Sequence, residues 1–244
     1  GKSVGRVANR IAKGKMIIEG VEYSLEINNG PNHLHGGSKG FANQLWESRV
    51  ETNRVVFSRV SPDGEQNYPG ELYVEAAYYF GDDNELEITY AAKSDRTTVV
   101  NMTNHSYFNL SGDPSRRVDN HILYINSDTY TPVDHTFMTT GEILPVEGTP
   151  MDFRTPAAIG DNIRNFDFQQ IMFGNGFDHN WCLNTAGDDT QVAARAYCPE
   201  TGICLEVFTD EPGVQFYSGN FLDGSCTGKN GVVYQQSTAF CLET

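Results

Sequence analysis

Hydrophobic and polar residues alternate with a period of two along much of this chain. Residues 71–78 and 85–90 both show the alternation, and the turn-forming sequence Gly-Asp-Asp-Asn at 81–84 separates them. Alternation places apolar side chains on one face of a strand and charged side chains on the other. The two segments therefore predict an antiparallel hairpin in a sheet that is wet on one side.

Other segments that are rich in β-branched and aromatic residues also predict strands. Two short strands are expected within 16–23, around a turn at Glu19 and Gly20. At 61–64, Pro62 presets φ for a turn and Gly64 suits a left-handed position. The remaining predicted strands are 54–60, 121–125, 192–197, 203–208 and 214–217.

Helical signals are few. Thr155 is a candidate helix cap and Pro156 suits a first helical position, which predicts one or two turns before Gly160. Many strands and almost no helix indicate an all-β sandwich or barrel rather than a sheet built from alternating strands and helices. No repeat or linker-like segment interrupts the pattern, so we expect a single domain over residues 1–244.

The composition is that of a folded globular protein, with 39% hydrophobic and 11% aromatic residues in 244. The formal net charge is −15. Nucleic acid and anionic membranes attract basic faces, so neither is expected as a partner.

The five cysteines are odd in number and show no CxxC or Cys/His metal spacing. We interpret them as free thiols in a reducing compartment. The first residues lack an apolar signal-like region, and no apolar run approaches membrane-spanning length. A cytoplasmic location is therefore expected.

His33 and His35 would share one face if both lay on a strand. A metal would need a third ligand that the sequence does not nominate, so no metal site is predicted. A hydrogen-bonding role for His35 is favoured, because Gly36 and Gly37 would let a ligand approach the backbone. No phosphate-binding loop, dinucleotide motif or serine-hydrolase elbow is present.

The strongest candidate for acid–base chemistry is His105, which follows the strand-like run 97–100. Small polar residues and the aromatic residues Tyr107 and Phe108 surround it, and they could shield it from water. Glu243 directly follows the apolar residues 240–242, where burial would raise its pKa toward a value useful for a base. A frayed residue near the end of the chain is the plainer alternative.

Two further segments suit a carbohydrate. Residues 213–220 interleave amides with aromatic rings, which can bond sugar hydroxyls and stack on apolar sugar faces. A core strand between two turns is the alternative. In the pair Asp178 and His179, only one side chain could face a given pocket if both lie on a strand.

Eight short motifs together closely resemble the aldose 1-epimerase, or galactose mutarotase, family. The resemblance spans essentially the whole chain, and the order of several separate motifs makes it specific. In chain order, the motifs are GRVANRIA (5–12), LHGG (34–37), SPDG (61–64), NHSYFNL (104–110), TGE (140–142), GFDHN (176–180), GVQFY (213–217) and CLET (241–244).

The resemblance implies a large antiparallel β-sandwich of the galactose mutarotase-like supersandwich type. It implies interconversion of the α and β anomers of free aldohexoses such as D-galactose and D-glucose, without a cofactor. By motif match, Glu243 falls on the base and His105 on the acid. The positions that would bind or orient the sugar are Asn9, Arg10, His35, Asp178 and Gln215.

Family members carry further strands before Gly1 and a further stretch after Thr244, so we expect a domain truncated at both ends. We expect this domain to be a monomer or a weak dimer. Two alternatives remain at this stage. One is a non-catalytic carbohydrate-binding module on the same scaffold. The other is an epimerase acting on a hexose 6-phosphate, which would require additional basic residues near the sugar C6 position.

Overall fold

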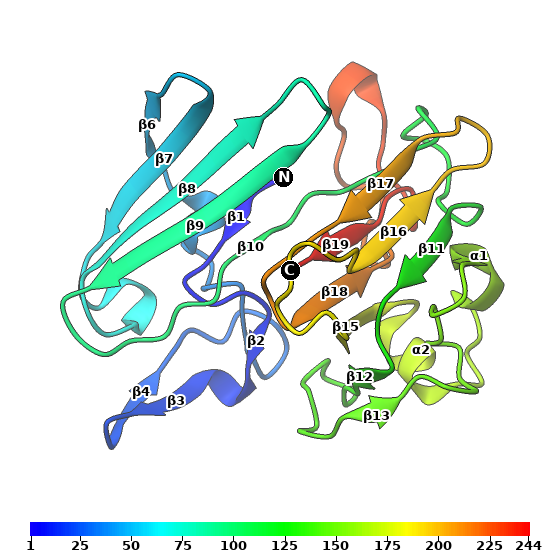
Figure 1. Ribbon diagram of the computed structural model, residues 1–244. Coiled ribbons are helices and arrows are strands. Elements are labelled where there is room, and N and C mark those ends of the chain that lie inside the picture. The colour runs from blue at the N-terminus through cyan, green and yellow to red at the C-terminus, as the bar shows by residue number, and fades with distance from the viewer. The chain divides into compact units, whose positions relative to one another are not determined.

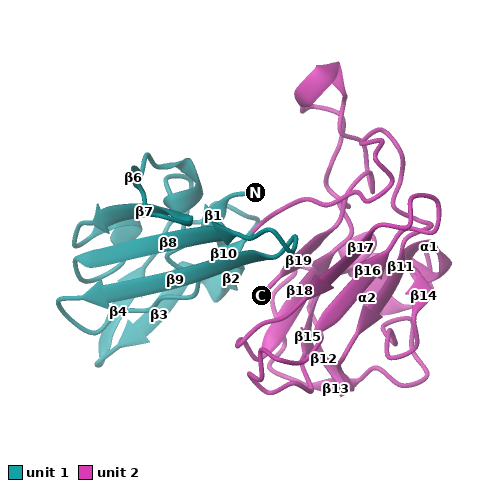
Figure 2. Cartoon of the chain, turned by 45° about the horizontal axis from the view of Figure 1, so that its top comes forward, with its two compact units in different colours: residues 1–104 teal, residues 105–244 magenta.

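The computed structural model describes residues 1–244. The chain divides into two compact units, residues 1–104 and residues 105–244, and each is described by itself (Figure 2). The expectation of one domain stays a prediction.

The first unit is built on a four-stranded antiparallel meander, in the order β6-β7-β8-β9 (Figure 1). Its strands are β6 (Glu47–Val50), β7 (Arg54–Ser61), β8 (Leu72–Phe80) and β9 (Leu86–Ser94). The predicted hairpin is confirmed as β8 and β9, in which Leu72 pairs with Ser94 and Phe80 with Leu86. Alternation decides the faces: Leu72 and Val74 are buried, whereas Tyr73 between them is exposed.

Three short strand pairs complete the first unit. Pairing joins β1 (Ser3–Val4) to β10 (Thr103–Asn104), β2 (Arg10–Ile11) to β5 (His33–Leu34), and β3 (Lys15–Ile18) to β4 (Val21–Ser24). The last pair confirms the two strands predicted within 16–23. Short 3-10 turns lie at Ala12–Gly14, Phe41–Asn43 and Glu65–Asn67.

A buried arginine connects the N-terminal segment to the loop after β7 through hydrogen bonds. Arg6 is 2% exposed, and its guanidinium donates to the side chain and carbonyl of Ser61 and to the carbonyls of Pro62, Pro69 and Gly70. The predicted turn at 61–64 lies in this loop, and Gly64 has the expected left-handed φ of 81°. The loop carbonyls that Arg6 binds would otherwise be buried acceptors without a donor.

The second unit contains two antiparallel sheets (Figure 1). The four-stranded sheet has the order β14 (Ala157–Ala158), β11 (Ile122–Ile125), β16 (Ala194–Tyr197) and β17 (Cys204–Val207). The five-stranded sheet has the order β13 (Leu144–Pro145), β12 (Thr129–Thr131), β15 (Asp178–Cys182), β18 (Gly213–Tyr217) and β19 (Cys241–Glu243).

Side chains from both sheets form one hydrophobic core. Leu123 and Ala194 of the first sheet belong to the same buried cluster as Trp181, Phe216 and Leu242 of the second. Aromatic rings fill much of it, since the ring centroids of Phe216 and Trp181 lie 6.0 Å apart. This common core makes the second unit a β-sandwich.

The helical prediction at 155–159 is wrong in its placement. Ala157 and Ala158 form β14 and pair with Leu123 and Ile122, and the helix α1 begins only at Ile159 (Ile159–Asn162). Pairing with the edge of the sheet outweighs the local cap signal. The hydrogen bonds to β11 come from a distant part of the chain, so the local sequence around Pro156 does not reveal them. A second short helix, α2 (Gln169–Gly174), and the 3-10 turn Lys229–Gly231 were not predicted.

All five cysteines are free, as predicted. No helix is both long and apolar enough to cross a membrane.

Candidate active site

The register of three strands places a set of polar side chains on one face of the five-stranded sheet. Glu243 on β19 lies opposite Gln215 on β18, and Cys241 lies opposite Tyr217. Asp178 on β15 lies opposite Tyr217 from the other side. Residues that pair directly in a sheet, and residues two apart on one strand, point to the same face.

The intervening residues point into the core. Phe216 and Leu242 are buried there, and His179 is 0% exposed. Asp178 and His179 face opposite sides of β15, as predicted from their adjacent positions on a strand. Both predictions for the segment 213–220, a core strand and an amide–aromatic surface, therefore apply. One face of β18 packs in the core, and the other face carries the amide and aromatic side chains.

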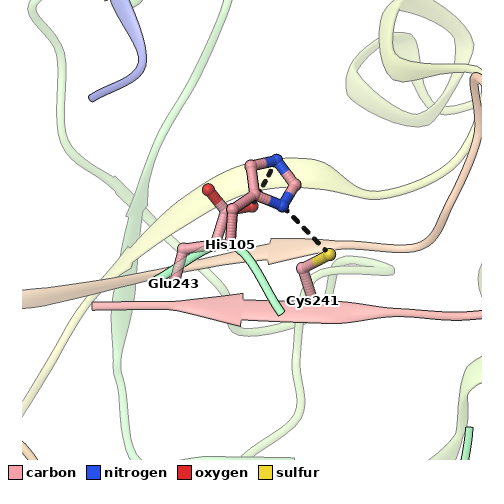
Figure 3. Close-up of side chains that lie close together, drawn as sticks. All are labelled: His105, Cys241 and Glu243. Atoms are coloured by element: carbon pink, nitrogen blue, oxygen red, sulfur yellow. Dashed lines mark hydrogen bonds and ion pairs between the residues drawn. The ribbon is translucent and has the colours of Figure 1, made fainter. Parts of the chain in front are cut away.

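His105 reaches this polar face from the segment that follows β10. Phe108 and Phe240 exchange two backbone hydrogen bonds, of 2.7 and 2.9 Å, which fix this segment beside the strand that ends in Glu243. As a result, Nε2 of His105 lies 3.6 Å from Oε1 of Glu243. Nδ1 of the same ring lies 3.5 Å from Sγ of Cys241 (Figure 3). The structure therefore brings the predicted acid and base together.

Glu243 is not frayed. It belongs to β19, which pairs with β18, and its side chain is 8% exposed, against 16% for the side chain of His105. Figure 3 shows Cys241 and Glu243 rising from the same side of their strand toward the imidazole.

Two tyrosines enclose the imidazole. The ring of Tyr107 stacks on His105 at a centroid distance of 5.1 Å, and Tyr217 meets it edge-on at 6.3 Å. Burial lowers the pKa of His105 and raises the pKa of both tyrosines, because it disfavours every charged form. Burial, with Glu243 and Asp178 nearby, also raises the pKa of Cys241 well above its ordinary value, so this residue is a thiol at neutral pH.

Asp178 and Gln215 form a second polar pair on the same face. The side-chain amide of Gln215 donates to Oδ1 of Asp178 over 2.8 Å. This bond orients the carboxylate and leaves the amide carbonyl of Gln215 as an acceptor on the face that carries Glu243.

The remaining predicted site residues form a group of their own in the first unit. The backbone N–H of Asn9 donates to Nδ1 of His35 over 3.0 Å, and that of His35 donates to the carbonyl of Asn9 over 3.0 Å. Arg10 donates to the side-chain oxygens of Asn29 at 3.0 Å and Asn9 at 3.3 Å. Because Nδ1 of His35 accepts a hydrogen bond, its ring proton is assigned to Nε2.

One expectation about the neighbourhood of His35 is wrong and another is untested. His33 does not share its face, because β5 ends at Leu34 and His35 adopts a left-handed φ of 53°. His33 is instead fully buried against the hydroxyl of Tyr68, 2.8 Å away. The approach of a ligand to Gly36 and Gly37 stays a prediction; the close contact that the structure shows is within the chain, since a Cβ added at Gly36 would lie 1.9 Å from the carbonyl oxygen of Gly5.

Cys241 was not predicted as a member of the site, whereas Tyr107 was expected to shield His105 and Tyr217 lies in the predicted amide–aromatic segment 213–220. For Cys241 a signal was available, because it stands two residues before Glu243 in a strand-like segment and therefore shares its face. For Tyr217, only the approach of separate segments shows the contact with His105.

A family model described as Aldose 1-epimerase matches residues 1–244. The chain belongs to the aldose 1-epimerase family. It is similar to the galactose mutarotases of Sus scrofa, at 51% identity, and Homo sapiens, at 50%; each match covers 100% of this chain and 69% of the relative. Among solved structures, an aldose epimerase homologue from C. elegans superimposes with a TM-score of 0.90 at 32% identity, over 100% of this chain and 72% of that one.

These comparisons confirm the predicted family and the mostly β, antiparallel fold. As an aldose 1-epimerase, the protein is an isomerase that interconverts the anomers of aldoses.

Proposed function

We propose that this aldose 1-epimerase acts on free D-galactose and D-glucose, with Glu243 as the base and His105 as the acid. The observation that carries the assignment is the separation of 3.6 Å between Nε2 of His105 and Oε1 of Glu243. Mutarotation moves protons at the anomeric hydroxyl and the ring oxygen, and both oxygens are bonded to the same carbon. A single acid and a single base held close together can serve both.

In ring opening, the carboxylate of Glu243 removes the proton of the anomeric hydroxyl while the imidazolium of His105 protonates the ring oxygen. The bond between C1 and the ring oxygen breaks, and C1 becomes an aldehyde. Burial lowers the pKa of His105, so a smaller fraction of the imidazole is protonated at neutral pH, but that protonated form is a stronger acid for this step.

In ring closure, the two groups exchange roles. After rotation about the C1–C2 bond, neutral His105 takes the proton of the former ring hydroxyl as this oxygen attacks the other face of the aldehyde. Protonated Glu243 returns its proton to the new anomeric oxygen. Both groups end as they began, so no cofactor is consumed.

The other polar residues would hold the sugar. Asp178 can accept hydrogen bonds from two neighbouring hydroxyls, and Gln215 offers its amide carbonyl. Asn9, Arg10 and His35 are proposed to bind further hydroxyls, Arg10 as a permanent cation that does not titrate. These sugar-holding roles rest on the hydrogen-bonded arrangement within each group.

Polarimetry tests the proposal directly. Freshly dissolved α-D-galactose and α-D-glucose should reach their equilibrium rotation far faster with the protein than in buffer alone. A galactose 6-phosphate sample tests the phosphorylated alternative. Binding of galactose without any acceleration would leave a carbohydrate-binding module and overturn the catalytic assignment.

A further inference from the structure

The strongest unassigned feature of the molecule is the mixture of donor types at one point of the five-stranded sheet. His105, Cys241 and Glu243 each offer one ligand atom, and these atoms all lie within 4.8 Å of one another. An imidazole nitrogen, a thiol sulfur and a carboxylate oxygen are the three side-chain donors that zinc takes in proteins. Acid–base chemistry on a sugar uses the imidazole of His105 and the carboxylate of Glu243, but it does not use the sulfur of Cys241.

We propose that His105, Cys241 and Glu243 form a binding site for a borderline-soft divalent cation such as Zn²⁺, and that the cation inhibits the enzyme by occupying its acid and base. The inhibition, but not the binding, rests on the proposed function. Binding displaces one proton from the thiol to solvent and forms a bond between sulfur and the metal.

The sulfur and the imidazole are already spaced for such a site. Two donors bound at about 2.0–2.3 Å to a tetrahedral zinc lie roughly 3.3–3.7 Å apart. The separation between Sγ of Cys241 and Nδ1 of His105 is 3.5 Å, which is within that range. Oε1 of Glu243 lies at the other edge of the ring, 3.6 Å from Nε2, and the three ligand atoms all lie within 4.8 Å of one another. The carboxylate, which shares a strand face with Cys241, therefore has to turn toward Nδ1 to reach the same ion.

The surroundings also favour a cation. Asp178, which lies across from Tyr217 in the same sheet face, adds a second carboxylate. The side chains of His105 and Glu243 are only 16% and 8% exposed, and low exposure to water strengthens the attraction between a carboxylate and an ion. Three protein ligands leave a fourth position, which a water molecule or a sugar hydroxyl can take.

Binding is tested with Co²⁺ as an optical probe. The test uses a parent protein without exposed cysteines, because exposed thiols could bind Co²⁺ elsewhere. Cys204 and Cys226 are exposed, so the parent protein is the full chain with Cys204→Ser and Cys226→Ser. Titration with Co²⁺ should produce a sulfur-to-metal charge-transfer band and tetrahedral d–d bands. Adding Cys241→Ser should abolish the charge-transfer band and weaken Co²⁺ binding by more than the roughly 10- to 100-fold that loss of an outer partner costs.

Inhibition is tested in the same parent with Zn²⁺. Mutarotation of α-D-galactose should stop as Zn²⁺ saturates the site, EDTA should restore it, and galactose should compete. Cys241→Ala serves as a second variant if the serine variant does not fold. An unchanged charge-transfer band in the Cys241 variants, or no Co²⁺ binding by a parent that does mutarotate, overturns the metal site. Co²⁺ binding through Cys241 in a parent without mutarotase activity would uphold the site and overturn the proposed function.

Discussion

Gln215 and Glu243 lie directly opposite each other on β18 and β19, and the amide of Gln215 also binds Asp178 on the far side. Gln215 therefore connects the proposed base with a proposed sugar-binding carboxylate, although it has no proton to give or take. Its position indicates a role in holding the substrate rather than in the proton transfers.

Gln215→Ala should weaken sugar binding with little effect on the maximal rate. Loss of one hydrogen bond to the substrate, at about 1–1.5 kcal/mol, corresponds to roughly a tenfold rise in KM. Steady-state polarimetry at varied galactose concentration measures it. Gln191→Ala is the control, since Gln191 is exposed and its amide binds only Asp188. A fall in kcat with an unchanged KM would contradict the role given to Gln215.

His105→Asn should reduce kcat by about 100-fold or more, because the variant keeps a polar side chain but cannot donate the proton to the ring oxygen. Galactose affinity, measured by calorimetry, should change little. His135→Asn is matched in chemistry, and His135 is exposed, so its rate should equal that of the parent. A near-normal rate for His105→Asn would remove this residue from the mechanism.

Arg6→Met should lower the free energy of unfolding by about 3 kcal/mol or more. The guanidinium is buried and satisfies the carbonyls of Pro69 and Gly70, which a thioether cannot do. Urea denaturation measures the change. Arg96→Met is the control, since Arg96 makes only exposed ion pairs, with Asp63 and Asp95, worth at most about 1 kcal/mol. Equal losses in the two variants would show that Arg6 does not stabilise the loop.

Acid should destabilise the protein through His179. Burial lowers the pKa of His179 from 6.5 to about 3, and Nε2 has no hydrogen-bond partner. Between pH 6.5 and 3, His179 is protonated in the unfolded chain but neutral in the folded chain. The free energy of unfolding is therefore not reduced by His179 above pH 6.5, and it falls as the pH drops below that value. The slope from this one group reaches about 1.4 kcal/mol per pH unit.

His179→Gln should flatten the pH dependence of stability between pH 6 and 4 by up to that slope, as measured by urea denaturation at each pH. Carboxylates also titrate at the lower end, but they affect parent and variant alike. The exposed His135→Gln should keep the parent slope. If His179→Gln also keeps it, the buried imidazole is not the source of the acid sensitivity.

The sequence by itself determined the family and most strands of the sheets. Alternation at 71–78 and 85–90 specified β8 and β9, because side chains point to alternate faces of any strand whatever its partner. It also nominated His105 and Glu243, through a local setting and a motif match. The helix predicted at 155–159 was misplaced, because pairing of Ala157 and Ala158 with β11 outweighed the local cap signal.

Only the tertiary structure decided what surrounds those two residues. Cys241 and His105 are 136 positions apart in the chain, and the backbone bonds between Phe108 and Phe240 bring them within 3.5 Å. Sequence patterns report the face on which a side chain lies, since that depends on neighbours in the same strand. The register between distant strands depends on long-range hydrogen bonds and on a shared core, and these exist only once the chain has folded.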